Sequence, residues 1–295
     1  MRIKKIIPPA LLATALLLAI TRLAAADGPG WKHLFSLAAD QTGGHLLRPL
    51  GLFIDAQNER YYVTDSGHDR LVSFAKDGQF RQAFNAGGAL KKPIDLTRLT
   101  DGRLLVLEKG RDTVTEINLK ARSVTPHALE YQGRRLAPRR LKLHGGRLYV
   151  LDQASGGLMT LDDNFQVTGR IACPGCRAGF ADFSFKGDEL YALPQLGHEV
   201  LVFDAQGTLA RKIALTPAPE FPVSLAVDGE GGLLVLERHT GTVASYLADG
   251  RLTGRHLGAE QPAGGLSYPA EIQIDPWGRV CVVDEGNGRV SVFQP

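Results

Sequence analysis

The sequence predicts an all-β fold, a six-bladed β-propeller of four-stranded blades, and three observations predict it. Glycine is frequent, with 34 of 295 residues, which suits a chain that turns about every ten residues. A phrase of two apolar residues, a marker residue that is usually acidic, a short turn and an alternating strand occurs six times. Successive markers are 43, 44, 42, 43 and 47 residues apart, a period typical of one propeller blade.

Residues 1–26 precede the repeats and have the composition of a secretory signal peptide. Three of the first five residues are basic, an apolar stretch spans 11–20, and the segment ends in three alanines. The apolar stretch has about half of the roughly 20 residues that a membrane-spanning helix needs. We expect cleavage after Ala26, no stable membrane insertion afterwards, and a periplasmic or secreted protein. An uncleaved anchor is the alternative.

The signal segment also accounts for the basic charge of the whole chain. It holds four of the 34 Lys and Arg residues and no acidic residue, so residues 27–295 carry 30 basic against 31 acidic side chains. A nucleic-acid-binding protein normally has a basic excess or a clustered basic stripe. Here only the pairs Arg134-Arg135 and Arg139-Arg140 are clustered. We therefore expect no nucleic acid among the partners.

Each repeat contains four short stretches with the alternating pattern of strands. A proline precedes the first strand in five repeats: Pro49, Pro93, Pro138, Pro222 and Pro269. In the fourth repeat Ala181 is predicted in the proline's place. The second strand ends at the marker residue, and tight turns such as Asp77-Gly78 separate the third strand from the fourth.

The two ends of the repeat region complement each other. The last repeat stops at Pro295 after its third strand, and residues 31–38 form a lone strand before the first proline. Closing the ring with this strand leaves no blade unpaired. We therefore predict that 31–38 complete the sixth blade, and that 27–295 are one monomeric domain without a linker.

The repeat resembles the NHL repeat, and its sixth copy carries the motif most completely at Pro269, Asp284, Gly286, Asn287, Arg289 and Phe293. The fourth copy departs most, with Pro194 at the acidic position. The resemblance covers nearly all of 31–295 and implies a six-bladed propeller. NHL relatives include peptide-binding and RNA-binding scaffolds, and antibiotic lyases and gluconolactonase-type hydrolases share the wider architecture. The resemblance therefore implies a specific fold but no specific function.

Five markers are acidic and end the second strands of their repeats: Asp65, Glu108, Asp152, Glu237 and Asp284. A carboxylate at this place can accept backbone N–H bonds and fix the hairpin bend, and its repetition favours that structural role. The alternative is an acidic rim at one mouth of the channel, which would attract cations or basic ligands. We keep all of them except Asp152 as candidate ligand-binding residues.

Charged residues also occur where the innermost strands should be apolar. Asp95, Arg140 and Glu271 each lie two residues after a repeat proline, with Arg139 beside them; Gly51, Phe183 and Ser224 are predicted at the same place in the other repeats. Such side chains should lie near one mouth of the channel, and buried charges require partners. They either pair between blades or form a polar ligand pocket.

The favoured function is a scaffold that presents this mouth to a protein, a peptide or a small polar ligand. We expect the site on the side of the interblade loops, because the opposite face consists of short glycine turns with little side chain. The alternative is a lyase or hydrolase with its active site at the same mouth, with or without a metal. No nucleophile–base pair in the sequence separates the two.

Three histidines follow the markers of their repeats: His68, His198 and His239. Three histidines around an open position would make a catalytic zinc shell. These three are out of register, however, and two belong to opposite blades. We therefore predict no cofactor, with a divalent metal as the alternative, and keep His68 and His239 as candidate ligand-binding residues.

The chain has three cysteines, two of them close together. Cys173 and Cys176 are predicted to form a local disulfide, which suits an exported protein. So small a loop gains only about 2 kcal/mol in the entropic description of disulfides. A redox-active or metal-binding pair is the alternative. Cys281 alternates into a strand and is predicted to be a buried free thiol.

Overall fold

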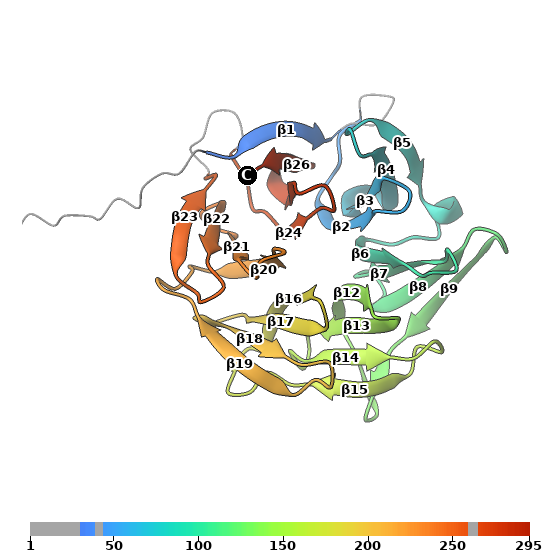
Figure 1. The fold of residues 1–295 in the computed structure, drawn as a ribbon. Helices are drawn as coiled ribbons and strands as arrows, with labels where there is room; N and C mark the ends of the chain where they lie inside the picture. The colour runs from blue at the N-terminus through green and yellow to red at the C-terminus, as the bar shows by residue number, and fades with distance from the viewer. Residues whose placement is uncertain (1–29, 39–43, 259–264) are drawn as a thin grey trace, which may run out of the picture.

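Six four-stranded antiparallel sheets stand as blades around a central channel in the computed structural model (Figure 1). The structure describes residues 30–38, 44–258 and 265–295; the predicted signal peptide lies outside these ranges. The innermost strand of each blade lies next to the channel and the fourth strand lies at the rim. The predicted all-β propeller fold is confirmed.

Blades 1 to 3 follow one another along the chain. Blade 1 comprises β2 (Pro49–Asp55), β3 (Arg60–Asp65), β4 (Arg70–Ala75) and β5 (Phe80–Phe84). Blade 2 comprises β6 (Pro93–Arg98), β7 (Leu104–Glu108), β8 (Thr113–Asn118) and β9 (Ser123–Ala128). Blade 3 comprises β12 (Pro138–His144), β13 (Arg147–Asp152), β14 (Leu158–Leu161) and β15 (Val167–Ile171).

Blades 4 to 6 complete the ring. Blade 4 comprises β16 (Phe180–Lys186), β17 (Glu189–Pro194), β18 (Glu199–Phe203) and β19 (Leu209–Ala214). Blade 5 comprises β20 (Pro222–Val227), β21 (Leu233–Glu237), β22 (Thr242–Tyr246) and β23 (Leu252–His256). Blade 6 comprises β24 (Glu271–Ile274), β25 (Val280–Asp284), β26 (Arg289–Gln294) and β1 (Lys32–Leu37).

Short elements occupy the connections. The hairpin β10 (Glu130–Tyr131) and β11 (Arg134–Arg135) lies between blades 2 and 3. Three 3-10 turns are η1 (Ser66–His68), η2 (Ala86–Gly88) and η3 (Glu285–Asn287). Within the described ranges, no helix has the length and apolar character needed to cross a membrane.

The N-terminal strand closes the ring as predicted. β1 pairs antiparallel with β26, from Lys32 opposite Gln294 to Leu37 opposite Val290. Just before it, Trp31 stacks on a histidine of β23 with ring centroids 4.5 Å apart. The closing segment therefore contacts blade 5 as well as completing blade 6.

The core lies between the blades. Neighbouring blades cover both faces of a middle strand, so all five residues of β7 are buried, whereas three of the five residues of β5 at the rim are exposed. Between blades 6 and 1, for example, Tyr61 and Val63 pack in one cluster with Cys281 and Val283. This packing explains why the second strands are almost continuously apolar.

One strand differs from the sequence prediction by one residue. In blade 4, Pro194 pairs with Phe180, and a bulge separates this pair from Asp182 opposite Leu193. The prediction that Ala181 takes the proline's place is therefore wrong, because Phe180 occupies it. The correction changes which residue of blade 4 faces the channel.

Candidate functional site in the central channel

Six residues, one from each innermost strand, occupy equivalent positions around the channel: Gly51, Asp95, Arg140, Asp182, Ser224 and Glu271. We call them the channel ring. In blades 2 to 6 the ring residue lies opposite the residue just before the marker. A side chain at Gly51 is excluded, because its Cβ would lie 2.6 Å from the carbonyl oxygen of Ile94 in the next blade.

Asp182 is the ring residue that the sequence analysis missed. The predicted residue, Phe183, lies one place further along the strand and packs in an apolar cluster between blades 3 and 4. A signal was present: the hairpins of blades 3 and 4 have equal lengths, with His144 opposite Arg147 and Lys186 opposite Glu189. Counting back from the turn, rather than forward from the proline, identifies the correct residue.

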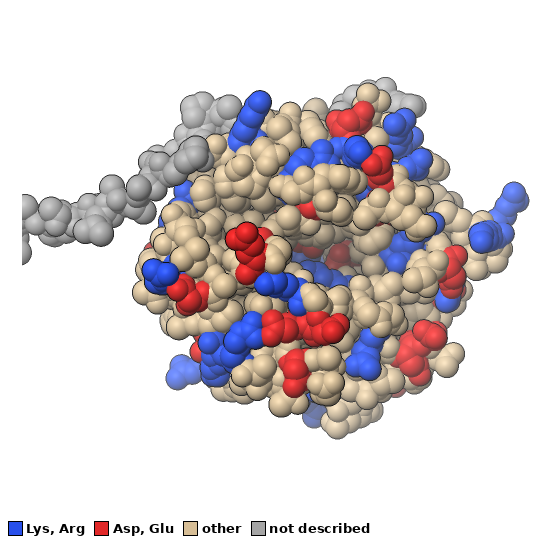
Figure 2. Space-filling model, viewed as in Figure 1, with Lys and Arg blue, Asp and Glu red and all other residues tan. Residues whose placement is uncertain are grey.

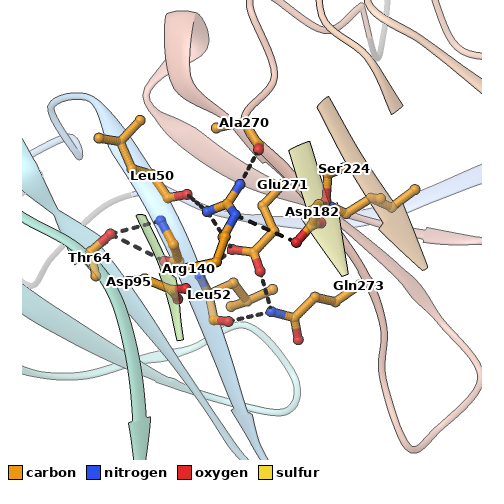
Figure 3. Close-up of polar contacts among 12 residues, drawn as sticks. Leu50, Leu52, Thr64, Asp95, Arg140, Asp182, Ser224, Ala270, Glu271 and Gln273 are labelled. Atoms are coloured by element: carbon orange, nitrogen blue, oxygen red, sulfur yellow. Dashed lines mark hydrogen bonds and ion pairs between the residues drawn. The ribbon is translucent and has the colours of Figure 1, made fainter. Parts of the chain in front are cut away.

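Four of the ring side chains fasten their own blade to the next one. Their oxygen atoms accept backbone N–H bonds from the following innermost strand: Glu271 from Leu52 (2.9 Å), Asp95 from Leu141 (2.8 Å), Asp182 from Leu225 (3.1 Å) and Ser224 from Ile272 (3.1 Å). Ser224 also donates its hydroxyl hydrogen to Asp182 at 2.5 Å (Figure 3). These bonds satisfy polar groups that water cannot reach.

Arg140 crosses the channel within this ring. It extends from blade 3 to the opposite side, where it donates to the carbonyl oxygens of Leu50 (3.3 Å) and Ala270 (2.5 Å) (Figure 3). Its Nε lies 3.8 Å from Asp182 Oδ1, and its Nη1 lies 3.8 Å from Glu271 Oε2. Only 5% of Arg140 is exposed. Arg140 and Glu271 are therefore brought together as an interblade contact.

Three carboxylates and two cations belong to the ring or line the channel beside it, and the charge of Arg139 on the loop-face side also acts on Asp182. Asp182 is 3.8 Å from Arg140 and 3.9 Å from Lys142, and Glu271 is 3.8 Å from Arg140. Asp95 has no cationic nitrogen of a described residue within 4.0 Å. Burial acts to raise the pKa of Asp182, but the charges of Lys142 and Arg140 hold it below its ordinary value. Burial and the negative charge of Glu271 raise the pKa of Asp95 to about 8.

The raised pKa of Asp95 predicts how stability depends on pH. The unfolded chain releases this proton near the ordinary value of 3.8, whereas the folded chain retains it up to about pH 8. The contribution of Asp95 to the free energy of unfolding is therefore fully present below pH 4. It is lost as the pH rises to 8, by up to about 1.4 kcal/mol per pH unit. Urea unfolding at pH 5 and pH 8 should show a smaller pH dependence for Asp95→Asn; an equal dependence would contradict the shift.

A cavity of about 290 Å³ extends from the ring along the channel. It is lined by residues at and after the ring positions, including 52–54 of β2, 141–143 of β12 and 271–274 of β24. These strands run toward the turn face, where the turns between first and second and between third and fourth strands lie (for example 99–103 and 76–79). The cavity therefore lies on the side where few ligand-binding side chains were expected, and its lining comes from the innermost strands and not from the turns. Figure 2 shows the hollow at the centre of the disc.

The other side of the ring is the loop face, where the interblade connections and the second-to-third-strand turns lie (for example 85–92 and 66–69). Arg139 is half-buried there and has no hydrogen bond or ion pair with a described residue. Burial and the positive charges of Arg140 and Arg238 lower its pKa. Arg238 donates to the carbonyl oxygen of Pro269 (3.2 Å) and to Glu285 (2.6 Å). Basic side chains therefore gather at the loop-face mouth.

The acidic markers do not form a rim at that mouth. Each is almost fully buried and accepts the backbone N–H of a residue one or two places before the repeat proline of its own blade. The pairs are Asp65 with Leu47, Glu108 with Lys91, Asp152 with Ala137, Glu237 with Glu220, and Asp284 with Ser267. Basic or hydroxyl side chains bind the remaining oxygens in four of the five, for example Arg70 at Asp65. These acids hold the entering loop against the second strand.

The candidate histidines are not brought together. His68 Nδ1 lies 2.8 Å from Asp65 Oδ2, and His239 packs edge-on against Phe221 with ring centroids 4.8 Å apart. His198 lines a separate groove. Across the described ranges, no group of three or more His, Cys, Asp or Glu side chains is arranged to hold a metal ion.

The cysteines lie away from the channel ring. Cys173 and Cys176 are joined by a disulfide in the connection between blades 3 and 4. Cys281 is a free thiol in β25 and is fully buried, and this burial raises its pKa. Neither feature contacts the ligand-accessible part of the channel.

The chain matches known proteins by structure only. No family model and no curated protein matches the sequence. A catalytically inactive virginiamycin B lyase from Staphylococcus aureus with quinupristin is 12% identical, with 84% of this chain and 80% of that chain covered and a TM-score of 0.62. A gluconolactonase from Xanthomonas campestris is 16% identical, with 88% of each chain covered and a TM-score of 0.65.

Hydrazine synthase from Kuenenia stuttgartiensis is also similar, at 12% identity, with 85% of this chain and 96% of that chain covered and a TM-score of 0.59. At such low identities the likeness establishes the fold alone. The six-bladed propeller is therefore supported independently, and the finer resemblance to NHL repeats stays a prediction.

Proposed function

We propose that the protein is an exported binding scaffold that holds an acidic segment of a protein or peptide partner on its loop face. The observation that carries this proposal is Arg139, a half-buried guanidinium at the channel mouth with no hydrogen bond or ion pair to a described residue. A guanidinium binds a carboxylate through two parallel hydrogen bonds. Because surrounding residues already restrict this side chain, it loses little freedom on binding.

Exposed aromatic residues beside the mouth support a protein or peptide partner. Phe221 is 64% exposed and Tyr268 is 59% exposed. Arg238 lies between them: its backbone N–H bonds to the carbonyl oxygen of Phe221, and its guanidinium lies 5.9 Å from the ring of Tyr268. Aromatic and arginine side chains are enriched in protein interfaces and dominate their binding energy. Apolar and cationic groups on one surface suit a partner that alternates apolar and acidic residues.

The proposal predicts a charge-dependent interaction that Arg139 controls. On arrays of 12-residue peptides with mixed acidic and apolar sequences, the protein should prefer acidic peptides over copies with Lys in place of Asp and Glu. Arg139→Ala should weaken the best peptide about 10- to 100-fold in fluorescence polarisation, because a charged hydrogen bond is lost. Its melting temperature should be unchanged, because Arg139 holds no other part of the protein.

Arg251→Ala is the matched control, since Arg251 is an exposed arginine on the turn face that pairs only with Asp249. It should bind the peptide as the unmodified protein does. Equal binding of acidic and basic peptides would refute the proposal, and so would undiminished binding by Arg139→Ala.

A lyase or hydrolase is the second candidate, and the names of two structural neighbours favour it. Asp95 would be the acid–base group, because it is a buried carboxyl with a raised pKa at a cavity. Hydrolysis of a lactone by the purified protein, lost in Asp95→Asn, would favour this candidate over the scaffold.

A further inference from the structure

We propose that the channel cavity is a second binding site, which takes a small organic cation, a protonated amine with an apolar body, from the turn face. The site lies on the opposite side of Arg140 from the loop face. The inference is therefore independent of the proposed scaffold function.

The cavity has the shape and lining of a small-ligand site. Its volume of about 290 Å³ is at the lower end of the usual range for ligand pockets. Its lining combines apolar residues, Phe53 and Phe185 among them, with polar atoms that make up slightly more than half of its accessible surface. Its polar lining includes Asp95 and Glu271 on two different blades. An amphiphilic molecule can therefore place its polar end at the ring and its apolar body along the walls.

The balance of charges selects a cation. Arg140 and Lys142 together offset two of the three carboxylates, and Asp95 is left without an ion pair to a described residue. Lys142 does not supply a free charge, because it donates to the carbonyl oxygen of Phe183 at 2.5 Å and lies 3.9 Å from Asp182. Near neutral pH Asp95 holds a proton, and a ligand ammonium next to it would replace that proton and keep the charge of the cluster unchanged.

Two unpartnered buried atoms lie beside the cavity, in residues that do not line it themselves, and point to a missing polar group. Asp182 Oδ1 and Arg140 Nε have no hydrogen-bond partner, and water cannot reach them because the two residues are only 0% and 5% exposed. The two atoms are 3.8 Å apart, and the Nζ of cavity-lining Lys142 is 3.9 Å from the same oxygen. Native proteins rarely leave such atoms unsatisfied. Lys142, which lines the cavity, connects this pair of atoms to a ligand bound there.

An organic cation fits this site better than a metal ion. Metal sites require several convergent ligands, and the described part of the chain has no group of three or more such side chains placed to bind one. Phenyl rings in the wall, such as Phe53 and Phe185, can contact an ammonium or its apolar body. These rings supply no oxygen or nitrogen ligand to a hydrated metal ion.

Binding should be coupled to a proton. Asp95 faces Glu271 on β24 and Arg140 on β12, while Asp182 and Lys142 complete the charged surroundings. A cation beside Asp95 favours its ionised form, so the proton that the carboxyl holds near neutral pH passes to the buffer. Affinity should therefore increase from pH 6 to pH 8, while the amine remains protonated.

Calorimetry with benzylamine tests the site, and benzyl alcohol serves as its neutral analogue. We expect saturable binding of benzylamine to the full chain, at least tenfold weaker binding of the alcohol, and release of close to one proton when buffers of different ionisation enthalpy are compared. Asp95→Asn should reduce the affinity for benzylamine at least tenfold. Arg139→Ala, on the loop face, should leave it unchanged.

A second variant tests the site in case Asp95→Asn does not fold. Val227→Trp fills the cavity from its wall and should abolish benzylamine binding while leaving peptide binding on the loop face intact. Equal affinities for amine and alcohol would overturn the inference, and so would undiminished binding in Val227→Trp. The same is true if benzylamine, cyclohexylamine and ethylamine all fail to bind at millimolar concentration.

Discussion

Deletion of residues 31–38 should lower the melting temperature by about 10–20 °C, the largest effect that we expect from any change to this chain. β1 supplies the fourth strand of blade 6, and without it the backbone of β26 loses its partner. The deletion also removes the fully buried Leu37 and the stacking of Trp31 on blade 5. Losing the buried Leu37 together with the partly buried Trp31 and Phe35 costs about 5 kcal/mol, which corresponds to a shift of this size.

Circular dichroism during heating measures the shift, and Leu34→Ser is the control. Leu34 lies in the same strand but is exposed, so this variant should melt within about 2 °C of the unmodified protein. A synthetic peptide of residues 31–38 should partly restore the melting temperature of the deleted protein, in proportion to its concentration. An unchanged melting temperature after the deletion would refute the closure of the ring by this strand.

Replacement of Arg140 by methionine should cost about 3–5 kcal/mol in the free energy of unfolding. The variant loses the bonds to the carbonyl oxygens of Leu50 and Ala270 on the far side of the channel. It also leaves Asp182 and Glu271 buried with Lys142 as their one remaining cation within 4.0 Å among the described residues. Breaking a buried ion pair from one side is costly because the stranded charge cannot be solvated.

The neighbouring arginine provides a matched control. Arg139→Met removes the same charge one residue earlier, from a side chain without a hydrogen bond to a described residue, and should change the free energy of unfolding by less than about 1 kcal/mol. Guanidinium unfolding of both variants measures the difference. Equal stabilities would mean that Arg140 is not an interblade tie, and its charge would then be available to a ligand.

The architecture could be predicted from the sequence because it depends on local patterns repeated along the chain. Repeats of about 43 residues with alternating strands and glycine turns predict four-stranded blades. The sixth repeat lacks its fourth strand and a lone strand precedes the first repeat, which predicts that this strand closes the ring. The structure places Lys32–Leu37 beside β26, as this count of strands predicts. Such patterns reflect the two-residue period of a strand and the turns that join strands, which are independent of distant contacts.

The candidate site could be predicted only in part. Asp95, Arg140 and Glu271 were recognisable as charges in an apolar position, and the structure does place them in one ring. Their fourth charged neighbour, Asp182, was missed because blade 4 has no proline to mark the start of its first strand. The count began at Ala181 instead of Phe180, although Asp182 follows Phe180 by the same two residues as Arg140 follows Pro138. A shift of one residue in a strand moves a side chain to the opposite face, so a small error in counting exchanged a charge for a phenylalanine.

Only the tertiary structure decided what each charge contacts. The repetition of the acidic markers favoured buried ties over an exposed rim. Only the structure shows that Asp65 and Asp284 bind the loops that enter their blades 17 or 18 residues earlier in the chain. Arg140 contacts Ala270, 130 residues away, and thereby separates a loop-face mouth from a cavity that faces the turns. Local patterning determines which face of a strand a residue occupies. Which residues meet across a closed ring depends on long-range packing. Those contacts in turn determine the burial of each charge, the charge balance and the access to the channel.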